Sequence, residues 1–299
     1  MPARASAPDA TTMRSVHACL MLLPALFLLV AFTHWPALST LIDSFYSTPK
    51  GARAGVWVGI ENYRAMADDP VFWQSVRNNL WFASATIPLS IGLALLMALW
   101  VNERIAGRAF LRMAYFTPTV LPMIAVANIW LFFYTPQYGL LEQLTGLLGL
   151  PAHNWLGSPS TALGAVTVVA IWKEAGFFMI VYLAALQTLN PSLREAAAIE
   201  GASRWYFFRR VQLPLLMPTT LLVMVNAVIN AVRMVDHVVV LTRGGPNNAS
   251  TLLLYHLFTV GFSFWDTAYA SAITVVLVVV LASVALFQFF VLDRRVHYK

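Results

Sequence analysis

Charge is what this sequence has least of. Only 11% of its 299 residues are Asp, Glu, Lys or Arg, whereas 59% are hydrophobic. A soluble globular protein carries about 25% charged residues, so the composition excludes an ordinary water-soluble chain. The net charge of +6 is spread in short clusters between apolar runs. That distribution favours orientation in a membrane and argues against a nucleic-acid partner.

Cysteine and nucleotide-binding motifs are also scarce. The single cysteine, Cys19, excludes an internal disulfide and a cysteine-based zinc site. The chain has no G-x-x-x-x-G-K-[ST] run, so we expect no ATP-binding loop of its own. Several histidines lack the spacing of metal ligands, namely His17, His34, His153, His256 and His297. A membrane enzyme is the weakest interpretation because no nucleophile, base and orienting group recur together. The sequence therefore predicts no catalytic residue, metal or cofactor.

Long apolar runs are abundant. A helix needs about 20 apolar residues to cross a bilayer. Six stretches qualify, at residues 17–35, 80–101, 113–134, 161–187, 213–241 and 267–292. The first resembles a signal peptide in having Arg4 and Arg14 before its apolar run, but no A-x-A cleavage pattern follows, and we interpret it as an uncleaved helix. The prediction is an all-α polytopic membrane protein with six transmembrane helices.

The positive charges predict the orientation. With both termini in the cytoplasm, twelve of the 19 Lys and Arg residues fall on the inner side and five on the outer side. The outer five are Lys50, Arg53, Arg64, Arg77 and Arg243. The loop from Thr135 to Ser160 has no Lys or Arg, which is typical of an exported loop.

Polar residues in the predicted spans point to a route through the membrane. Asn226, Asn230, Arg233 and His237 are spaced by four, three and four residues, which is one face of a helix. We expect this stripe to line a translocation path, although contacts between helices would give the same spacing, and we expect Asp236 to pair with Arg233.

The fourth span carries Lys173 and Glu174. Adjacent residues point about 100° apart on a helix, so each needs a partner elsewhere, either in this chain or in a second subunit. We expect both to hold helices together, with direct contact to a substrate as the alternative. Prolines are the other local feature of the spans. Pro118 and Pro122 should bend the third span, and Pro88 the second.

One charged segment, from Arg194 to Pro218, interrupts the apolar pattern between the fourth and fifth spans. Its local signals predict two short helices: Asn190 and Pro191 begin the first, Gly201 ends it, and Ser203 caps the second. Pro214 should kink the path into the fifth span. An amphipathic segment lying on the anionic inner leaflet, with Trp205 to Phe208 in lipid, explains the composition equally well.

The spacing within this segment resembles the EAA loop of ABC importer permeases, roughly E-A-A-x-x-D-G-A-x8-I-x-L-P. The matching residues are Glu195, Ala196, Ala197, Glu200, Gly201, Ala202, Leu213 and Pro214. Glu200 replaces the usual Asp, and Val211 the usual Ile. The resemblance implies that these residues couple the membrane helices to a separate ATPase.

Further stretches resemble the carbohydrate permeases of the maltose and glycerol-3-phosphate type: VGIENYRAM (58–66), the run from Ile171 to Ala202, and VVLTRGGPNNAST (239–251). The similarity extends from about residue 17 to the end. It implies the type I (MetI-like) importer fold, with tails at 1–16 and 293–299, a permease domain at 17–292 and a coupling loop at 190–214.

The implied partners are an ABC ATPase dimer, a second homologous permease, a periplasmic or lipid-anchored solute-binding protein and membrane lipid. The implied substrate is a sugar or polyol phosphate, and the implied location is the bacterial inner membrane. The alternative is a proton-coupled secondary transporter with Lys173, Glu174, Arg233 and Asp236 as its relay.

Overall fold

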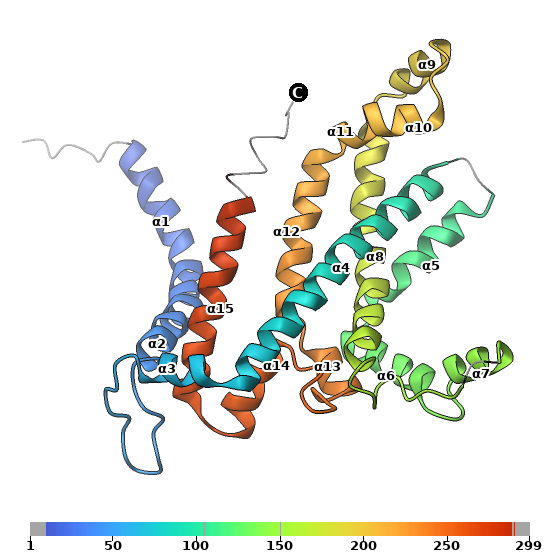
Figure 1. Cartoon of the computed structure of the whole chain (residues 1–299). Helices are drawn as coiled ribbons and strands as arrows, with labels where there is room; N and C mark the ends of the chain where they lie inside the picture. The colour runs from blue at the N-terminus through green and yellow to red at the C-terminus, as the bar shows by residue number, and fades with distance from the viewer. Residues whose placement is uncertain (1–9, 104–105, 150, 289, 291–299) are drawn as a thin grey trace, which may run out of the picture. The chain divides into compact units, whose positions relative to one another are not determined.

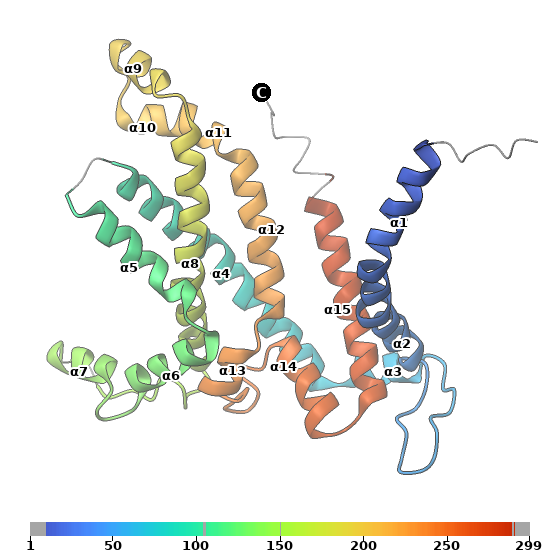
Figure 2. The same cartoon turned by 180° about the vertical axis from the view of Figure 1, so that it is seen from behind.

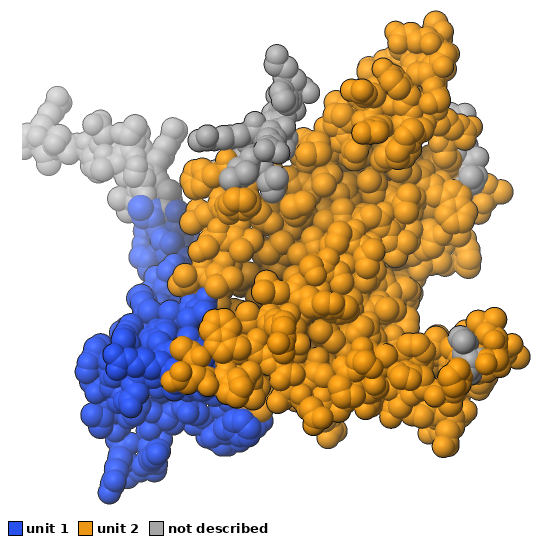
Figure 3. Space-filling view, in the orientation of Figure 1, with its two compact units in different colours: residues 1–66, 260–276 blue, residues 67–259, 277–299 orange. Residues whose placement is uncertain are grey.

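The computed structural model describes residues 10–103, 106–149, 151–288 and 290. Regular structure in these residues is helical, and two isolated β-bridges, Tyr46–Trp57 and Lys50–Arg53, are the only strand-like pairings among them. The chain divides into two compact units, coloured in Figure 3: residues 1–66 with 260–276, and residues 67–259 with 277–299. The predicted tail at 293–299 and residues 1–9 of the other tail lie outside the described residues, as does Arg104.

The first unit begins with an apolar rod. It consists of α1 (Ala10–Leu29), the π-helix η1 (Val30–His34) and α2 (Trp35–Asp43), and the loop that follows carries the two β-bridges. The first unit also contains most of α3 (Glu61–Asp68), most of η3 (Thr259–Ser263) and the start of α15 (Thr267–Phe287). None of the described side chains from Cys19 to Asp43 is buried, although this stretch is apolar enough to span a bilayer.

The second unit is a helical bundle. Its long helices are α4 (Pro70–Asn102), α8 (Ala162–Thr188) and α12 (Met217–Arg233). The shorter helix α5 (Arg108–Val120) packs against α8. The short helices α9 (Ser192–Ile199) and α10 (Arg204–Phe207) lie at one end of the bundle (Figures 1 and 2). The opposite end carries α6 (Met123–Tyr134), α7 (Leu140–Leu147) and α13 (Asp236–Leu241), and α14 (Leu253–Phe258) follows.

Small residues allow the central helices to approach closely. Ala94 and Ala98 of α4 are fully buried against Phe178, Met179 and Tyr182 of α8. In membranes, small residues at helix interfaces replace the hydrophobic driving force with close packing and interhelical hydrogen bonds. A bond of the latter kind joins the Tyr182 hydroxyl to Thr220 Oγ1 of α12 at 3.1 Å.

In the described part of the chain, five helical stretches are long and apolar enough to cross a membrane, and a strongly bent pair of helices makes six if it counts as one span. The five are Cys19–Asp43, Pro70–Asn102, Ala162–Thr188, Met217–Leu241 and Thr267–Phe287. The broken span combines α5 and α6, which meet at an angle of 104° next to Pro122. The bend expected from the prolines of the third span is thus present, whereas α4 continues through Pro88 without interruption. The all-α membrane fold is confirmed.

Candidate coupling and translocation sites

The charged segment folds as the two short helices that the sequence predicts. Asn190 Oδ1 accepts a hydrogen bond from the Ser192 amide at 3.0 Å, and Ser203 Oγ accepts one from the Tyr206 amide at 3.2 Å. Gly201 ends α9 with φ +69°. The amides of Ala202 and Gly201 bond to the carbonyls of Ala197 and Ala198, which is the Schellman arrangement of a helix C-terminus.

Helix α9 is largely uncovered by the described residues of the bundle. It has no buried residue, and Ile199 is 88% exposed. Glu195, Ala196, Glu200 and Gly201 are exposed as well. Its one described ion pair joins Arg194 to both oxygens of Glu103, at 3.1 Å, at the end of α4. An isolated helix of eight residues is marginal in water, and burial within this chain contributes little to the stability of α9.

Leu213 and Pro214 lie apart from α9. They form α11 (Leu213–Leu215), between the π-helix η2 (Phe208–Gln212) and α12. Proline lacks an amide hydrogen, so a regular ladder cannot pass Pro214, and the backbone changes form at this point. Of the remaining matching residues, Ala197 and Ala202 are half-buried. The eight EAA-type residues therefore divide into an exposed helix and a kink that leads into α12.

Lys173 and Glu174 each bind a different neighbouring helix, as their adjacency predicted. The Lys173 ammonium donates to the carbonyls of Leu121 at 2.6 Å and Pro118 at 3.1 Å, where α5 breaks. Glu174 Oε2 accepts a hydrogen bond from Asn230 Nδ2 at 2.7 Å. Lys173 thus holds the broken span, while Glu174 links α8 to α12.

The stripe on the fifth span is only partly as predicted. Asn226 and Asn230 lie on α12, and Arg233 is exposed at its last residue. Helix α12 stops there and α13 starts at Asp236, so His237 does not continue the same face. His237 is fully buried with its ring 5.8 Å from that of Phe82, which corrects its placement on a water-lined surface.

The expected ion pair between Arg233 and Asp236 is wrong for the same reason. The break after Arg233 removes the helical spacing that would bring the two side chains together, and both are exposed. Among the described residues, the contacts between acidic and basic side chains are Arg194–Glu103 and Asp69–His256, and the second is an ion pair only when His256 is protonated. Asn226 bonds to the Leu222 carbonyl of its own helix at 2.9 Å.

A small cavity with a mainly apolar lining lies beside the Glu174–Asn230 pair. Its polar lining comes from three helices: Thr86 and Ser90 of α4, Glu174 of α8 and Asn230 of α12. Its volume of about 10 Å³ is space for about one water molecule. Thr86 and Ser90 are buried, and sequence reasoning missed them. Their signal was the run Thr86, Ser90, Ala94, Ala98, in which a small residue recurs every fourth position.

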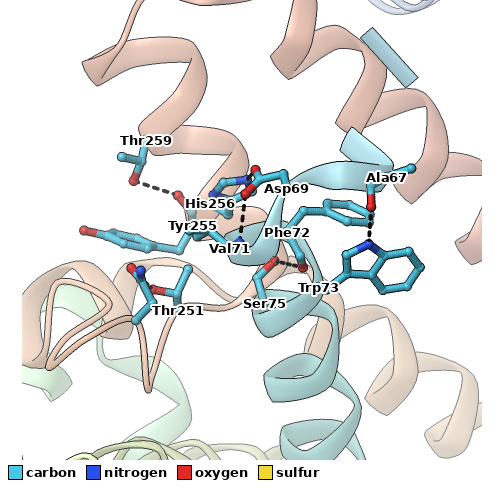
Figure 4. Close-up of polar contacts among 11 residues, drawn as sticks. Ala67, Asp69, Val71, Phe72, Trp73, Ser75, Thr251, Tyr255, His256 and Thr259 are labelled. Atoms are coloured by element: carbon cyan, nitrogen blue, oxygen red, sulfur yellow. Dashed lines mark hydrogen bonds and ion pairs between the residues drawn. The ribbon is translucent and has the colours of Figure 1, made fainter. Parts of the chain in front are cut away.

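At the opposite end of the bundle, polar residues fasten α4 to the chain after α13. Asn78 Nδ2 donates to the carbonyls of Asn248 at 2.9 Å and Thr251 at 3.0 Å. Figure 4 shows Asp69, which accepts from the Val71 amide at 2.8 Å and pairs with His256 Nε2 at 3.2 Å. Burial lowers the pKa of His256, and the Asp69 carboxylate opposes that shift. Sequence reasoning missed this pair because its members are far apart in the chain.

Comparison with known proteins identifies the family. The model of the binding-protein-dependent transport system inner membrane component matches residues 90–298. The trehalose/maltose transport system permease protein MalF of Thermococcus litoralis is 33% identical over 267 residues, covering 88% of this chain and 89% of the relative. The sn-glycerol-3-phosphate transport system permease protein UgpA of Brucella abortus is 32% identical over 279 residues, covering 93% and 95%.

The fold is that of a solved importer. The crystal structure of a bacterial ABC transporter involved in the import of the acidic polysaccharide alginate matches with a TM-score of 0.84 and 24% identity, covering 94% of this chain and 96% of that one. These matches favour the importer interpretation over the proton-coupled transporter. The chain belongs to the binding-protein-dependent transport system inner membrane components and is a permease subunit of the ABC importer type.

Proposed function

We propose that this permease moves a carbohydrate or polyol phosphate into the cell, driven by a separate ABC ATPase dimer that docks on α9. The observation that carries the proposal is the exposed, capped helix α9, which contains Glu195, Ala196 and Ala197, is followed directly by Glu200, Gly201 and Ala202, and has no buried residue of its own. Its flat alanine surface allows close approach, and Glu195 and Glu200 add polar contacts at its two ends. ATP hydrolysis would occur in the partner.

Motion of α9 would reach the bundle through two connections. One is the ion pair between Arg194 and Glu103, which joins α9 to the end of α4. The other is the covalent path through α10, η2 and the kink at Leu213 and Pro214 into α12. Since α4 and α12 both line the cavity beside Glu174 and Asn230, a shift of α9 would act on that cavity from two sides.

The substrate route would pass the Glu174–Asn230 pair. Amide and carboxylate groups suit the hydroxyls of a sugar, because together they donate and accept hydrogen bonds. In the described conformation the cavity admits only about one water molecule, so a substrate requires the helices to separate. We assign Asn226 and Arg233 to the two ends of this route, and Lys173 and His237 to the packing of its walls.

Two further partners follow from the family and the surfaces. The apolar rod from Cys19 to Asp43 would face lipid or a second, homologous permease, since its side chains are unburied in this chain. A solute-binding protein, periplasmic or lipid-anchored, would deliver the substrate at the end opposite α9. The proposal includes a location in the bacterial inner membrane with both termini in the cytoplasm, which the distribution of Lys and Arg supports.

The test is uptake by reconstituted vesicles. Vesicles containing this permease, its ATPase, its second permease and its binding protein should accumulate a radiolabelled sugar or glycerol phosphate when ATP is enclosed. Omitting the ATPase or the binding protein should abolish uptake. Asn230→Ala, which leaves Glu174 without its partner, should slow uptake without reducing assembly. Uptake by this chain alone, or uptake driven by a pH gradient, would refute the proposal.

A further inference from the structure

A groove runs between the end of α4 and the segment that follows α9. Its volume is about 330 Å³, within the range of about 300 to 1,000 Å³ that small-molecule sites occupy. One wall is formed by leucines of α4, and the other by aromatic residues of α10 and η2. The apolar lining consists of Leu95, Leu96, Leu99, Trp205, Phe207 and Phe208. We call this the α4–α10 groove.

The lining continues onto an apolar outer surface. Leu96 and Trp205 are each 66% exposed, so the outer edge of the groove is formed by apolar side chains whose contact with water is unfavourable. The rings of Trp205 and Phe208 lie 5.5 Å apart and form a continuous wall. An acyl chain suits such an open apolar groove better than a soluble ligand does, because lipid can fill it without leaving the bilayer.

The polar end of the groove is basic. Its cationic lining residues are Arg194 and Arg204. Glu103 neutralises Arg194 through two contacts of 3.1 Å, whereas Arg204 has no ion-pair partner among the described residues. Arg204 lies close to the position where the apolar run of α4 gives way to Asn102 and Glu103. At that boundary an exposed guanidinium meets the headgroups of the bilayer.

We propose that the α4–α10 groove binds an anionic phospholipid of the inner leaflet, with its phosphate on Arg204 and an acyl chain along Leu95, Leu96 and Leu99. This rests on the orientation in the proposed function, which places α10 on the cytoplasmic side. In this arrangement α9 contacts the ATPase, whereas α10 and η2 contact lipid. A bound lipid would stabilise the position of α10 and η2, which connect α9 to α12.

The experiment is native mass spectrometry of the full-length chain titrated with phosphatidylglycerol or with phosphatidylcholine of the same acyl chains. We expect preferential retention of phosphatidylglycerol. Arg204→Gln should weaken retention of phosphatidylglycerol about fivefold, which is the contribution of one basic residue to binding an anionic lipid. Retention of phosphatidylcholine should fall less, because its choline cation offsets the charge of its phosphate. The matched control is Arg210→Gln, which removes the same charge outside the groove and should have little effect.

A second variant tests the apolar part. Leu99→Trp fills the groove with every charge intact and should reduce retention of both lipids. Inorganic phosphate should not compete, since it lacks the acyl chain. Circular dichroism checks that each variant is folded.

Several results would overturn the proposal: equal losses in Arg204→Gln and Arg210→Gln, no effect of Leu99→Trp, or competition by phosphate, which would indicate a soluble anion. Lipid loss when the ATPase or second permease binds would show that a protein occupies the groove. Because retention requires neither ATP nor substrate, it can fail while vesicle uptake succeeds, and the reverse.

Discussion

Replacing Lys173 with methionine tests how the broken third span is held. Helix α5 ends at Val120, so the carbonyls of its last turn have no partner within the helix. The Lys173 ammonium satisfies two carbonyls there, those of Leu121 at 2.6 Å and Pro118 at 3.1 Å. A cation at a helix C-terminus also interacts favourably with the helix dipole. Methionine keeps the apolar stem of the side chain and removes all three donors.

The magnitude follows from two hydrogen bonds to a charged donor. Such bonds contribute about 1.5 to 3 kcal/mol each in soluble proteins, and hydrogen bonds between membrane helices average about 0.6 kcal/mol with a maximum near 1.7. We therefore expect Lys173→Met to lower the free energy of unfolding by about 2 kcal/mol, a factor of about 30 in the equilibrium constant. Lys173→Arg retains donors at the same site and should lose about half as much or less.

The assay is reversible unfolding of the purified chain in mixed detergent micelles, followed by tryptophan fluorescence. Glu174→Gln is the matched neighbour, because its side-chain oxygen still accepts from Asn230. A Lys173→Met protein within about 0.5 kcal/mol of the wild type would refute the role of the ammonium, since changes of that size are typical of substitutions away from any special feature. Equal losses in the Met and Arg variants would refute it as well.

Three further predictions concern turns, packing and pH. Gly201→Ala should uncouple ATP hydrolysis from uptake more than Gly201→Asn does, because a φ of +69° is strained for alanine and tolerated by asparagine. No atom lies within 4 Å of an added Cβ, so the difference comes from the backbone angle alone. The measurement is the ratio of ATP hydrolysed to substrate moved. Gly176→Ala should lower the thermal midpoint because its Cβ would meet the Tyr115 carbonyl, whereas Gly164→Ala on the same helix has open space and should not. Burial lowers the pKa of His256, so the neutral imidazole favours the folded state above about pH 6.5. This stability is lost as the pH falls toward the pKa of the folded state. Between about pH 7.5 and 5.5, the thermal midpoint should therefore drop more in the wild type than in His256→Gln.

Local signals in the sequence predicted the coupling segment well. The signals come from Asn190, Ser203 and Gly201, whose caps and left-handed turn involve only neighbouring residues in the chain. Such local features need no tertiary partner. The broken third span was predictable for the same reason, since Pro122 restricts its own backbone. The exposure of α9 was not a local property, and the resemblance to EAA loops was required to anticipate it.

The errors have a common physical origin. No glycine or proline marks the break after Arg233, so helical spacing was extended to His237 across Met234 and Val235, where the backbone leaves helical geometry. Backbone carbonyls have no sequence signature, and the partners of Lys173 were therefore invisible before α5 and α6 were placed. Asp69 and His256 meet only because α14 packs on the start of α4.

The position of α9 in the assembled importer can be measured with one cysteine. In a Cys19→Ser background, Ala196→Cys places the only thiol of the chain on the exposed face of α9, and Trp205→Cys places it in the α4–α10 groove. After reconstitution with the ATPase and second permease, the thiol at position 196 should crosslink to the ATPase, and the thiol at position 205 should react with a lipid-soluble probe. Labelling of position 196 by the lipid-soluble probe, without any crosslink to the ATPase, would contradict the account.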